Sequence, residues 1–425
     1  MNHELSLDLV QSSVLAGVLL ILGEFARRRV GFLQRFSIPG PVIGGFLFAL
    51  LLLVLRQADV ATVEFDTTLQ EPAMIAFFTT VGLTGSLSLV RKGGRLLIVY
   101  LLACWTLAVV QNLVGIGLAE VLGVNPLLGI MAGAVSLEGG HGAAAAFGPT
   151  AEAMGAEGAT AVAVASATFG LVAGSVLGGP LAGWLMKRGK VRVPTLVTAS
   201  TGSTTTVVDQ GSDTGSDSGS DTGRGPETEN AEESGSAGYR KLLSTGVLVG
   251  VIMVLGTLLG TWFSDTTGFV LPGYVGAMVV AVVFRNLNDR FGWVRLDSGT
   301  VDLISGLTLG FFLTMAMMSL KIWELYALAL PLVVILAVQV LVLVVFVAFV
   351  VFRLLGGNYD AATMAAGMMG HGLGGTPNAM ANMDAFNSRF GVRSERAFLV
   401  VPLAGAVLID LVGLPWIVWC MNWVG

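Results

Sequence analysis

Long apolar stretches alternate with short polar segments along most of the chain. Each apolar stretch has about 17–26 residues, and a helix needs roughly 20 residues to cross the hydrocarbon layer of a membrane. Strands of a membrane barrel would be about half as long and would alternate apolar with polar residues, so the pattern favours helices. The stretches predict ten membrane-spanning helices, at about 8–25, 39–56, 72–90, 96–121, 160–186, 241–263, 270–285, 300–320, 325–352 and 397–421.

Two more apolar segments, 126–158 and 360–394, are interrupted by glycine-rich breaks. The first break is SLEGGHG at 136–142, and the second is GHGLGGTPN at 370–378. Apart from His3, each histidine of the chain lies in one of these breaks. Irregular backbone at membrane depth is tolerated only where it is buried in protein or lines a wet cavity. We therefore expect two re-entrant loops that meet and form a site for a substrate and an ion.

Residues 194–239 differ in composition from the rest of the chain. They are rich in Ser, Thr, Gly and Asp and have almost no apolar residues after Val208, so they cannot bury enough surface to fold. We expect a disordered, acidic, cytoplasmic linker between two domains, 1–193 and 240–425, each with five helices and one loop. Much of the acid of the chain lies in this linker, so the net charge of -5 indicates little about partners.

The two halves also resemble each other in local sequence. An odd number of spans in the first half makes the second half run in the opposite sense, which predicts an inverted-topology repeat of the kind found in secondary transporters. Four matches occur in the same order: Ile38-Pro39-Gly40 with Leu271-Pro272-Gly273, Phe77-Phe78-Thr79-Thr80 with Phe311-Phe312-Leu313-Thr314, Val110-Gln111 with Val338-Gln339, and Pro180 with Pro415.

The distribution of basic residues predicts the orientation, because Lys and Arg are enriched in cytoplasmic loops. With both termini outside, all of the 23 Lys and Arg residues except Arg56 and Lys321 fall on the cytoplasmic side or in the linker. The first apolar stretch has no basic leader and no evident cleavage site, so we interpret it as a helix of the mature protein rather than a signal peptide.

Composition and motifs narrow the function classes. Only 12% of the residues are charged, against about 25% in soluble domains, which indicates a membrane protein. No basic patch is interleaved with aromatic residues, so nucleic acid is not an expected partner. The chain has no phosphate-binding GxxxxGK[ST] motif, no GxSxG motif near a histidine and no HExxH motif, so we do not expect an enzyme. Cys104 and Cys420 lie in apolar stretches and are interpreted as buried thiols.

Polar groups at membrane depth are the candidates for chemistry. Glu138 lies beside a glycine pair and could bind a cation, carry a proton or be solvated at the mouth of the loop. Asp410 lies in an apolar stretch without a basic neighbour in sequence and could bind Na⁺ or be a neutral structural acid. His141 and His371 could contact the substrate or make structural hydrogen bonds. The candidate substrate- and ion-binding residues are Ser136, Glu138, Gly139, Gly140, His141, Gly142, Gly370, His371, Gly372, Gly374, Gly375, Thr376, Asn378, Asn382 and Asp410, with Na⁺ expected at Asp410, Glu138 and loop carbonyls.

Other polar residues have weaker assignments. Gln111 and Gln339 lie in the middle of predicted helices, where hydrogen bonds between helices are the favoured interpretation. Ser175 occupies the place in the first half that Asp410 has in the second. Asn378 and Asn382 are about one helical turn apart, so they either face one side or cap helix ends. Thr80 and Thr314 are weaker candidates of the same kind.

The chain resembles the bacterial sodium/glutamate symporter family over nearly its whole length except the linker. The segments that carry the resemblance include FLQRFSIPGPVIGG at 32–45, GGHGAA at 139–144, ATFGLVAGSVLGGP at 167–180, and the stretches 70–95, 321–339 and 358–390, the last containing GLGGTPNAMANM. The resemblance implies Na⁺-coupled glutamate uptake, a fold similar to the sodium/citrate carriers, and a homodimer whose protomers each have a scaffold domain and a moving transport domain. Glu138 and Ala143 depart from the family, which typically has Ser and Thr there.

These observations lead to one hypothesis and its rivals. We expect a Na⁺-driven importer of L-glutamate in the cytoplasmic membrane that works by alternating access, with no cofactor besides Na⁺ as the coupling ion. A Na⁺- or H⁺-coupled carrier of another dicarboxylate is the alternative among transporters. A passive anion channel is the alternative from another class, and it differs because it cannot concentrate a substrate.

Overall fold

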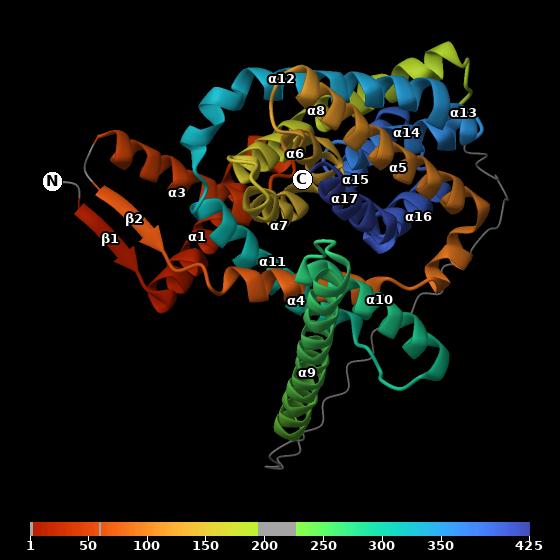
Figure 1. Ribbon diagram of the computed structural model, residues 1–425. Coiled ribbons are helices and arrows are strands. Elements are labelled where there is room, and N and C mark those ends of the chain that lie inside the picture. The colour runs from red at the N-terminus through yellow and green to blue at the C-terminus, as the bar shows by residue number, and fades with distance from the viewer. Residues whose placement is uncertain (1–2, 59–60, 194–226) are drawn as a thin grey trace, which may run out of the picture.

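The computed structural model describes residues 3–58, 61–193 and 227–425, and helices make up nearly all of these parts (Figure 1). In these parts, seven helical segments are long and apolar enough to cross a membrane. They are Leu9–Arg29, Gly40–Gln57, Gly93–Val121, Ala159–Arg188, Gly238–Thr267, Ser298–Met318 and Ile322–Leu354. The protein is therefore a helical, multi-pass membrane protein.

The other three predicted spans have physical reasons to differ from a simple apolar helix. α4 (Gln70–Thr84) has only 15 residues, and the predicted span to residue 90 instead ends at a turn before α5 (Ser88–Val121). α10 (Gly273–Phe291) ends in charged residues that include the ion pair Arg285–Asp289. The last span is divided by a π-helical segment, η4 (Ala404–Leu408), into α16 (Glu395–Leu403) and α17 (Asp410–Val424).

One bundle contains α1 (Leu9–Arg29), α3 (Gly40–Gln57), α4, α9 (Glu227–Thr267), α10 and α11 (Ser298–Met318), and we call it the first bundle. Glycines set two close crossings within it. A Cβ atom added to Gly23 of α1 would lie 2.0 Å from the carbonyl oxygen of Gly40 in α3, and one added to Gly276 of α10 would lie 2.4 Å from that of Gly256 in α9. α3 and α10 both begin directly after a proline, Pro39 and Pro272, in agreement with the predicted match between these segments.

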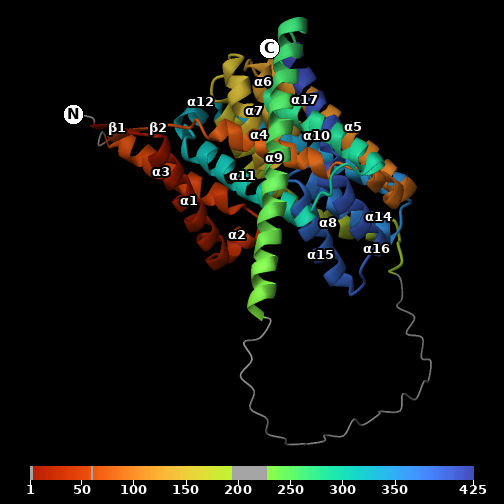
Figure 2. The same ribbon diagram turned by 90° about the horizontal axis from the view of Figure 1, so that it is seen from below.

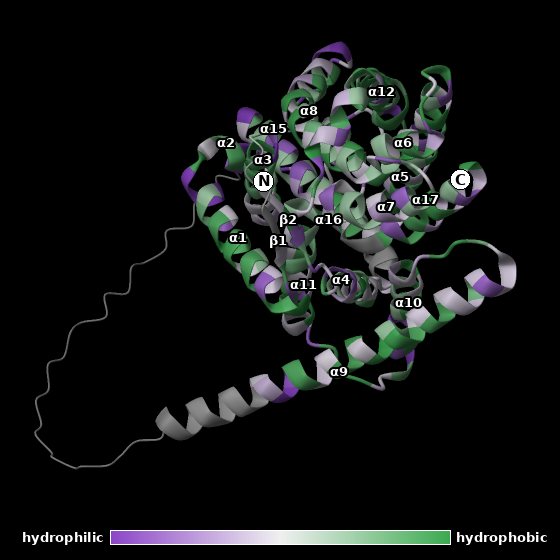
Figure 3. Cartoon of the chain, turned by 60° about the vertical axis from the view of Figure 1, so that its left-hand side comes forward, coloured by the Kyte–Doolittle hydropathy of each residue, from purple (hydrophilic) through white to green (hydrophobic). Residues whose placement is uncertain are grey.

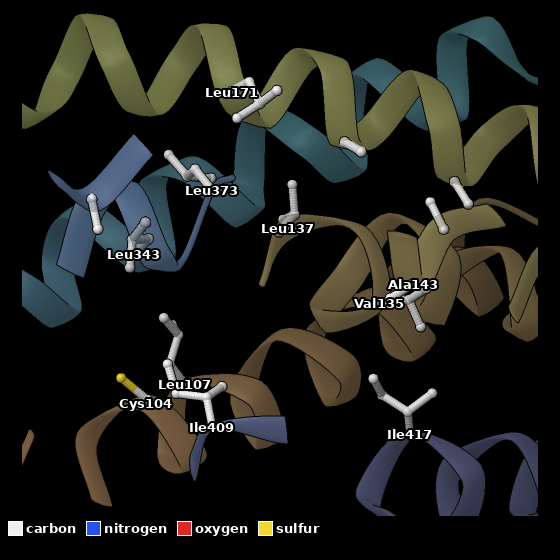
Figure 4. Packing of buried hydrophobic residues seen from close by; sticks show 14 of the residues in the cluster. Cys104, Leu107, Val135, Leu137, Ala143, Leu171, Leu343, Leu373, Ile409 and Ile417 are labelled. Atoms are coloured by element: carbon white, nitrogen blue, oxygen red, sulfur yellow. The ribbon is translucent and has the colours of Figure 1, made fainter. Parts of the chain in front are cut away.

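The second bundle contains the remaining long helices and both glycine-rich breaks. Its members are α5, α6 (Pro126–Ile130), η1 (Met131–Val135), α7 (Gly140–Ala153), α8 (Ala159–Arg188), α12 (Leu325–Phe346), η3 (Val347–Val351), α13 (Phe352–Leu354), α14 (Tyr359–His371), α15 (Thr376–Phe390), α16, η4 and α17. Figure 2 shows α1 and α3 on one side of the molecule, α5, α14 and α16 on the other, and α4 and α11 between them. In Figure 4, side chains from several members of this bundle, such as Leu107, Leu171 and Leu373, gather in one apolar core.

A two-stranded parallel ribbon lies within the described residues and is not part of the helical prediction. β1 (His3–Leu7) pairs with β2 (Ala61–Phe65), and Leu5 lies opposite Val63. β2 reads Ala-Thr-Val-Glu-Phe, and the β-branched and aromatic residues in it favour a strand once a partner strand is present.

Two short helices lie outside the two bundles. They are α2 (Gly31–Arg35), after α1, and the 3₁₀ turn η2 (Ile322–Glu324), before α12.

Residues 194–226 of the expected linker lie outside the described residues. α9 begins at Glu227, before the expected end of the linker at 239, because Glu and Ala residues in this stretch extend a helix readily. Figure 3 shows the apolar character along much of α9.

Candidate functional site

Each glycine-rich break joins two helical pieces into a hairpin. In the first, residues 136–139 connect η1 to α7, and in the second residues 372–375 connect α14 to α15. The tips are in contact: a Cβ atom added to Gly140 would lie 3.5 Å from the carbonyl oxygen of Gly374, and one added to Gly375 would lie 3.8 Å from that of Glu138. The two breaks therefore lie against each other, as the sequence predicts.

A cavity of about 250 Å³ lies where the tips meet. Its wall on one side comes from the first bundle, including Phe77, Phe78 and Leu309. The opposite wall comes from the second bundle and includes both breaks, Gly405 and Asp410. Ten of the predicted site residues line the cavity: Glu138, Gly139, Gly140, His141, Gly142, His371, Gly374, Gly375, Thr376 and Asp410.

The other five predicted site residues do not line the cavity but lie behind it. The hydroxyl of Ser136 donates a hydrogen bond to the carbonyl of Met131. Gly370 and Gly372 allow close contacts, since a Cβ on Gly370 would lie 2.3 Å from the backbone of Ala379. Asn378 and Asn382 are buried in the interface between α15 and α8 and hold the hairpin in place.

The two asparagines both face α8, and neither caps a helix. Asn378 Nδ2 donates to the carbonyl of Leu171 at 3.3 Å, and its Oδ1 accepts a hydrogen bond of 2.7 Å from the Ser175 hydroxyl. Asn382 Nδ2 donates to the carbonyl of Gly174 at 3.0 Å. Ser175, which sequence comparison placed opposite Asp410 in the repeat, is therefore a partner of the second hairpin.

A chain of hydrogen bonds fixes His371 at the end of α14. The Thr376 hydroxyl donates to the carbonyl of Gly405 at 3.0 Å, so it accepts from His371 Nε2 at 3.2 Å. The other ring nitrogen, Nδ1, lies 2.9 Å from the hydroxyl of Tyr100, which is fully buried and donates to it. Both ring nitrogens are thus used with a single proton, and His371 is a neutral positioning residue.

His141 has a similar anchor in the first hairpin. Its Nε2 lies 3.0 Å from the hydroxyl of Thr168 in α8, and that hydroxyl donates to the carbonyl of Val164 at 2.9 Å. Nε2 of His141 is therefore the donor, and Nδ1 has no hydrogen bond to any described residue. This leaves Nδ1 available to a ligand in the cavity.

Gln111 and Gln339 form the bridges between helices that their position predicts. Gln111 Nε2 in α5 donates to the carbonyl of Gly372 at 2.9 Å, and Gln339 Nε2 in α12 donates to the carbonyl of Gln111 at 2.7 Å. The chain of bonds connects two long helices to the second break. The hydroxyls of Thr80 and Thr314 donate to carbonyls of their own helices.

We predict that Gln111→Leu destabilises the protein, because it leaves the buried carbonyl of Gly372 without its donor. The expected loss is about 1–3 kcal/mol in the free energy of unfolding. Thermal unfolding in detergent measures it, with Gln57→Leu, at the exposed end of α3, as the matched control. Equal transition temperatures for the two variants would contradict this role.

Two carboxylates and two helix N-termini give the cavity its electrostatic character. Glu138 Oε1 is buried and has no hydrogen-bond partner in the part of the chain that the structure describes, and Asp410 stands at the start of α17. α7 and α15 begin at the cavity, and the first amides of a helix have no partner within it and carry partial positive charge. The site thus offers carboxylate and carbonyl oxygens to a hard cation and amide donors to an anion.

Comparisons with known proteins agree with one another. The family described as sodium/glutamate symporter matches residues 5–392. The sodium/glutamate symporter of Escherichia coli (strain K12) is 40% identical over 411 residues, which cover 96% of this chain and 95% of that protein. The protein of the same name from Haemophilus influenzae is 37% identical over 403 residues, which cover 95% and 94% of the two chains.

Proposed function

Because the chain belongs to the sodium/glutamate symporter family, we infer that it is a multi-pass membrane transporter that couples the movement of L-glutamate to that of Na⁺. It is a transporter and not an enzyme. The observation that supports this function most directly is the cavity between the two bundles, where two interrupted helical hairpins meet beside two carboxylates. Interrupted helices at a midplane site are the way in which secondary transporters expose backbone groups to substrates and ions.

We propose that the cavity binds glutamate through the starts of α7 and α15. Their free amides, at Gly140 to Gly142 and at Thr376, suit the two carboxylates of the substrate. His141 Nδ1 offers one more polar contact. The wall from the first bundle, with Phe77 and Leu309, covers the methylene groups of the substrate.

We propose that Asp410 and carbonyl oxygens of the breaks hold Na⁺. Asp410 lines the cavity, and no Lys or Arg is among the residues that line it, so a cation is the natural partner of this carboxylate. Na⁺ bound here would also lower the electrostatic cost of bringing an anionic substrate into the cavity.

The family resemblance supports a fuller architecture. We propose ten spans in two inverted repeats, with 126–158 and 360–394 as re-entrant loops that enter from opposite sides. The second bundle would carry the cavity across the membrane against the first bundle, giving alternating access. The glycine-mediated crossings of α1 with α3 and of α9 with α10 suit a rigid scaffold.

We propose that the protein lies in the cytoplasmic membrane. Both termini would lie outside the cell, and the linker would lie in the cytoplasm. Arg56 and Lys321, the two exceptions to the positive-inside pattern, are expected on the same side of the membrane. The guanidinium of Arg56 lies 4.0 Å from the ring centroid of Trp323, which is two residues after Lys321, and this contact supports a common location for the two basic residues. Cysteine labelling from the two sides of sealed membranes, at residue 3 and in the linker, tests this orientation.

A homodimer is the assembly that the family resemblance implies, and we propose it for this protein. The outward side of α9, with Val251, Leu258 and Trp262 exposed, belongs to the first bundle and does not border the cavity. Mass measurement of the detergent-purified protein tests the dimer.

Uptake of labelled L-glutamate into proteoliposomes tests the function. We expect accumulation above the external concentration with an inward Na⁺ gradient and none with equimolar K⁺. Equilibration without accumulation would indicate a passive anion channel. If glutamate is not taken up but another dicarboxylate is taken up with a Na⁺ or proton gradient, the protein is a carrier of that dicarboxylate.

A further inference from the structure

Among the described residues, two carboxyl side chains and no Lys or Arg line the cavity. Glu138 and Asp410 line it, and neither makes an ion pair with a basic residue within the described parts of the chain. Oε1 of Glu138 is buried and has no hydrogen-bond donor at all among the described residues. A buried carboxylate without a partner is costly, so a ligand that the protein binds in its working cycle is expected to supply one.

Few groups near the cavity can supply positive charge to offset the two carboxyl groups. His371 is neutral, because its two ring nitrogens are satisfied by a donor and an acceptor. The starts of α7 and α15 together are equivalent to about one positive charge. His141 has no described acceptor for a second proton on Nδ1, so an imidazolium there would be unpaired.

A bound glutamate makes the deficit larger. The substrate carries two carboxylates and one ammonium group, so it adds a net negative charge to the two that Glu138 and Asp410 carry when they are ionised. The two helix starts offset about one of these three charges. About two monovalent cations are then needed for a neutral occupied cavity, and only about one if Glu138 carried no charge.

We propose that Glu138 binds a second Na⁺, so that this transporter carries one more Na⁺ per glutamate than the same site without this carboxylate. This inference rests on the proposed function and specifies its coupling ratio. Glu138 lies within the first break, where the carbonyl oxygens of the irregular backbone provide the further oxygen ligands that Na⁺ requires. The extra ion would raise the concentrating power of the transporter at a given Na⁺ gradient.

The limit of accumulation measures this ratio. In proteoliposomes held at zero membrane potential with a tenfold Na⁺ gradient, each coupled Na⁺ contributes about a tenfold accumulation of glutamate. We expect Glu138→Gln to reach a limit about tenfold lower than the unmodified protein. Glu138→Asp, which keeps the charge, and Glu152→Gln, which removes a carboxylate from α7 outside the cavity, should keep the original limit.

A binding measurement gives the same quantity without transport. The slope of the logarithm of glutamate affinity against the logarithm of Na⁺ concentration counts the Na⁺ ions bound with glutamate, by linkage. We expect Glu138→Gln to lower this slope by about one in purified protein. Variants that bind glutamate without moving it are therefore still informative.

The outcomes separate this inference from the function on which it rests. Absence of Na⁺-driven glutamate accumulation by the unmodified protein would overturn the proposed function. Normal accumulation with the same limit and slope in Glu138→Gln would overturn the second Na⁺ site alone. A further outcome is that the part of the accumulation limit that depends on Glu138 follows an imposed pH gradient instead. That result would show that a proton neutralises Glu138, and it would also overturn the second Na⁺ site.

Discussion

Replacing Gly140 with Val is expected to abolish glutamate uptake, by about 100-fold or more, while the protein remains inserted in the membrane. Gly140 has a φ of 62°, and a β-branched residue is strongly disfavoured in this left-handed region. Its position opens α7 and touches the tip of the other hairpin at Gly374. Displacing the helix start by about 1 Å is enough to cost two orders of magnitude in rate at a site that depends on position.

Gly117→Val is the matched control for this experiment. It makes the same change in α5, where an added Cβ meets no atom within 4 Å and the backbone is helical. Uptake per inserted molecule should stay near that of the unmodified protein. Normal uptake by the Gly140 variant would show that this glycine serves only helix packing.

Asp410→Asn is expected to raise the Na⁺ concentration for half-maximal uptake by about tenfold or more. Removing one partner of a buried charge pair costs at least ~2 kcal/mol in typical cases, and 1.4 kcal/mol already corresponds to tenfold. The effect should fall on Na⁺ dependence more than on the amount of protein in the membrane, because Asn keeps the shape of the side chain.

The control for Asp410 is Asp384→Asn, on the exposed side of α15 and away from the cavity. Uptake is measured over a series of Na⁺ concentrations at constant ionic strength, and protein abundance is measured in the same membranes. An unchanged Na⁺ curve for the Asp410 variant would remove this residue from the ion site.

Local sequence predicted the parts of the site that depend on short-range signals. The glycine-rich breaks at 136–142 and 370–378 mark where helices must break, and they contain His141, His371 and Thr376, which line the cavity. The paired positions of Gln111 and Gln339 indicated bridges between helices, and the structure confirms these bridges. Long apolar runs gave the helical class, although only seven segments in the described residues have the length and hydropathy of clear spans.

Hydrogen-bond partners that are distant in the sequence could not be predicted from local sequence patterns. The bond from Tyr100 to His371 joins residues 271 positions apart, and nothing in the sequence around Tyr100 marks it as a site residue. The π-helical segments and the short β ribbon depend on tertiary packing, since π-helices are rare and β2 forms a strand only with its partner β1. Ser136 and the two asparagines have side chains suited to ligands, yet packing directs them to carbonyls behind the cavity.

The parallel β ribbon can form only after residue 65 has been synthesised. β1 is made first but has no partner until β2 emerges, and α1 and α3 are made between them. Parallel pairing brings both strands to one place, next to the close crossing of α1 with α3. The ribbon therefore ties together the two ends of the helical pair formed by the first 65 residues.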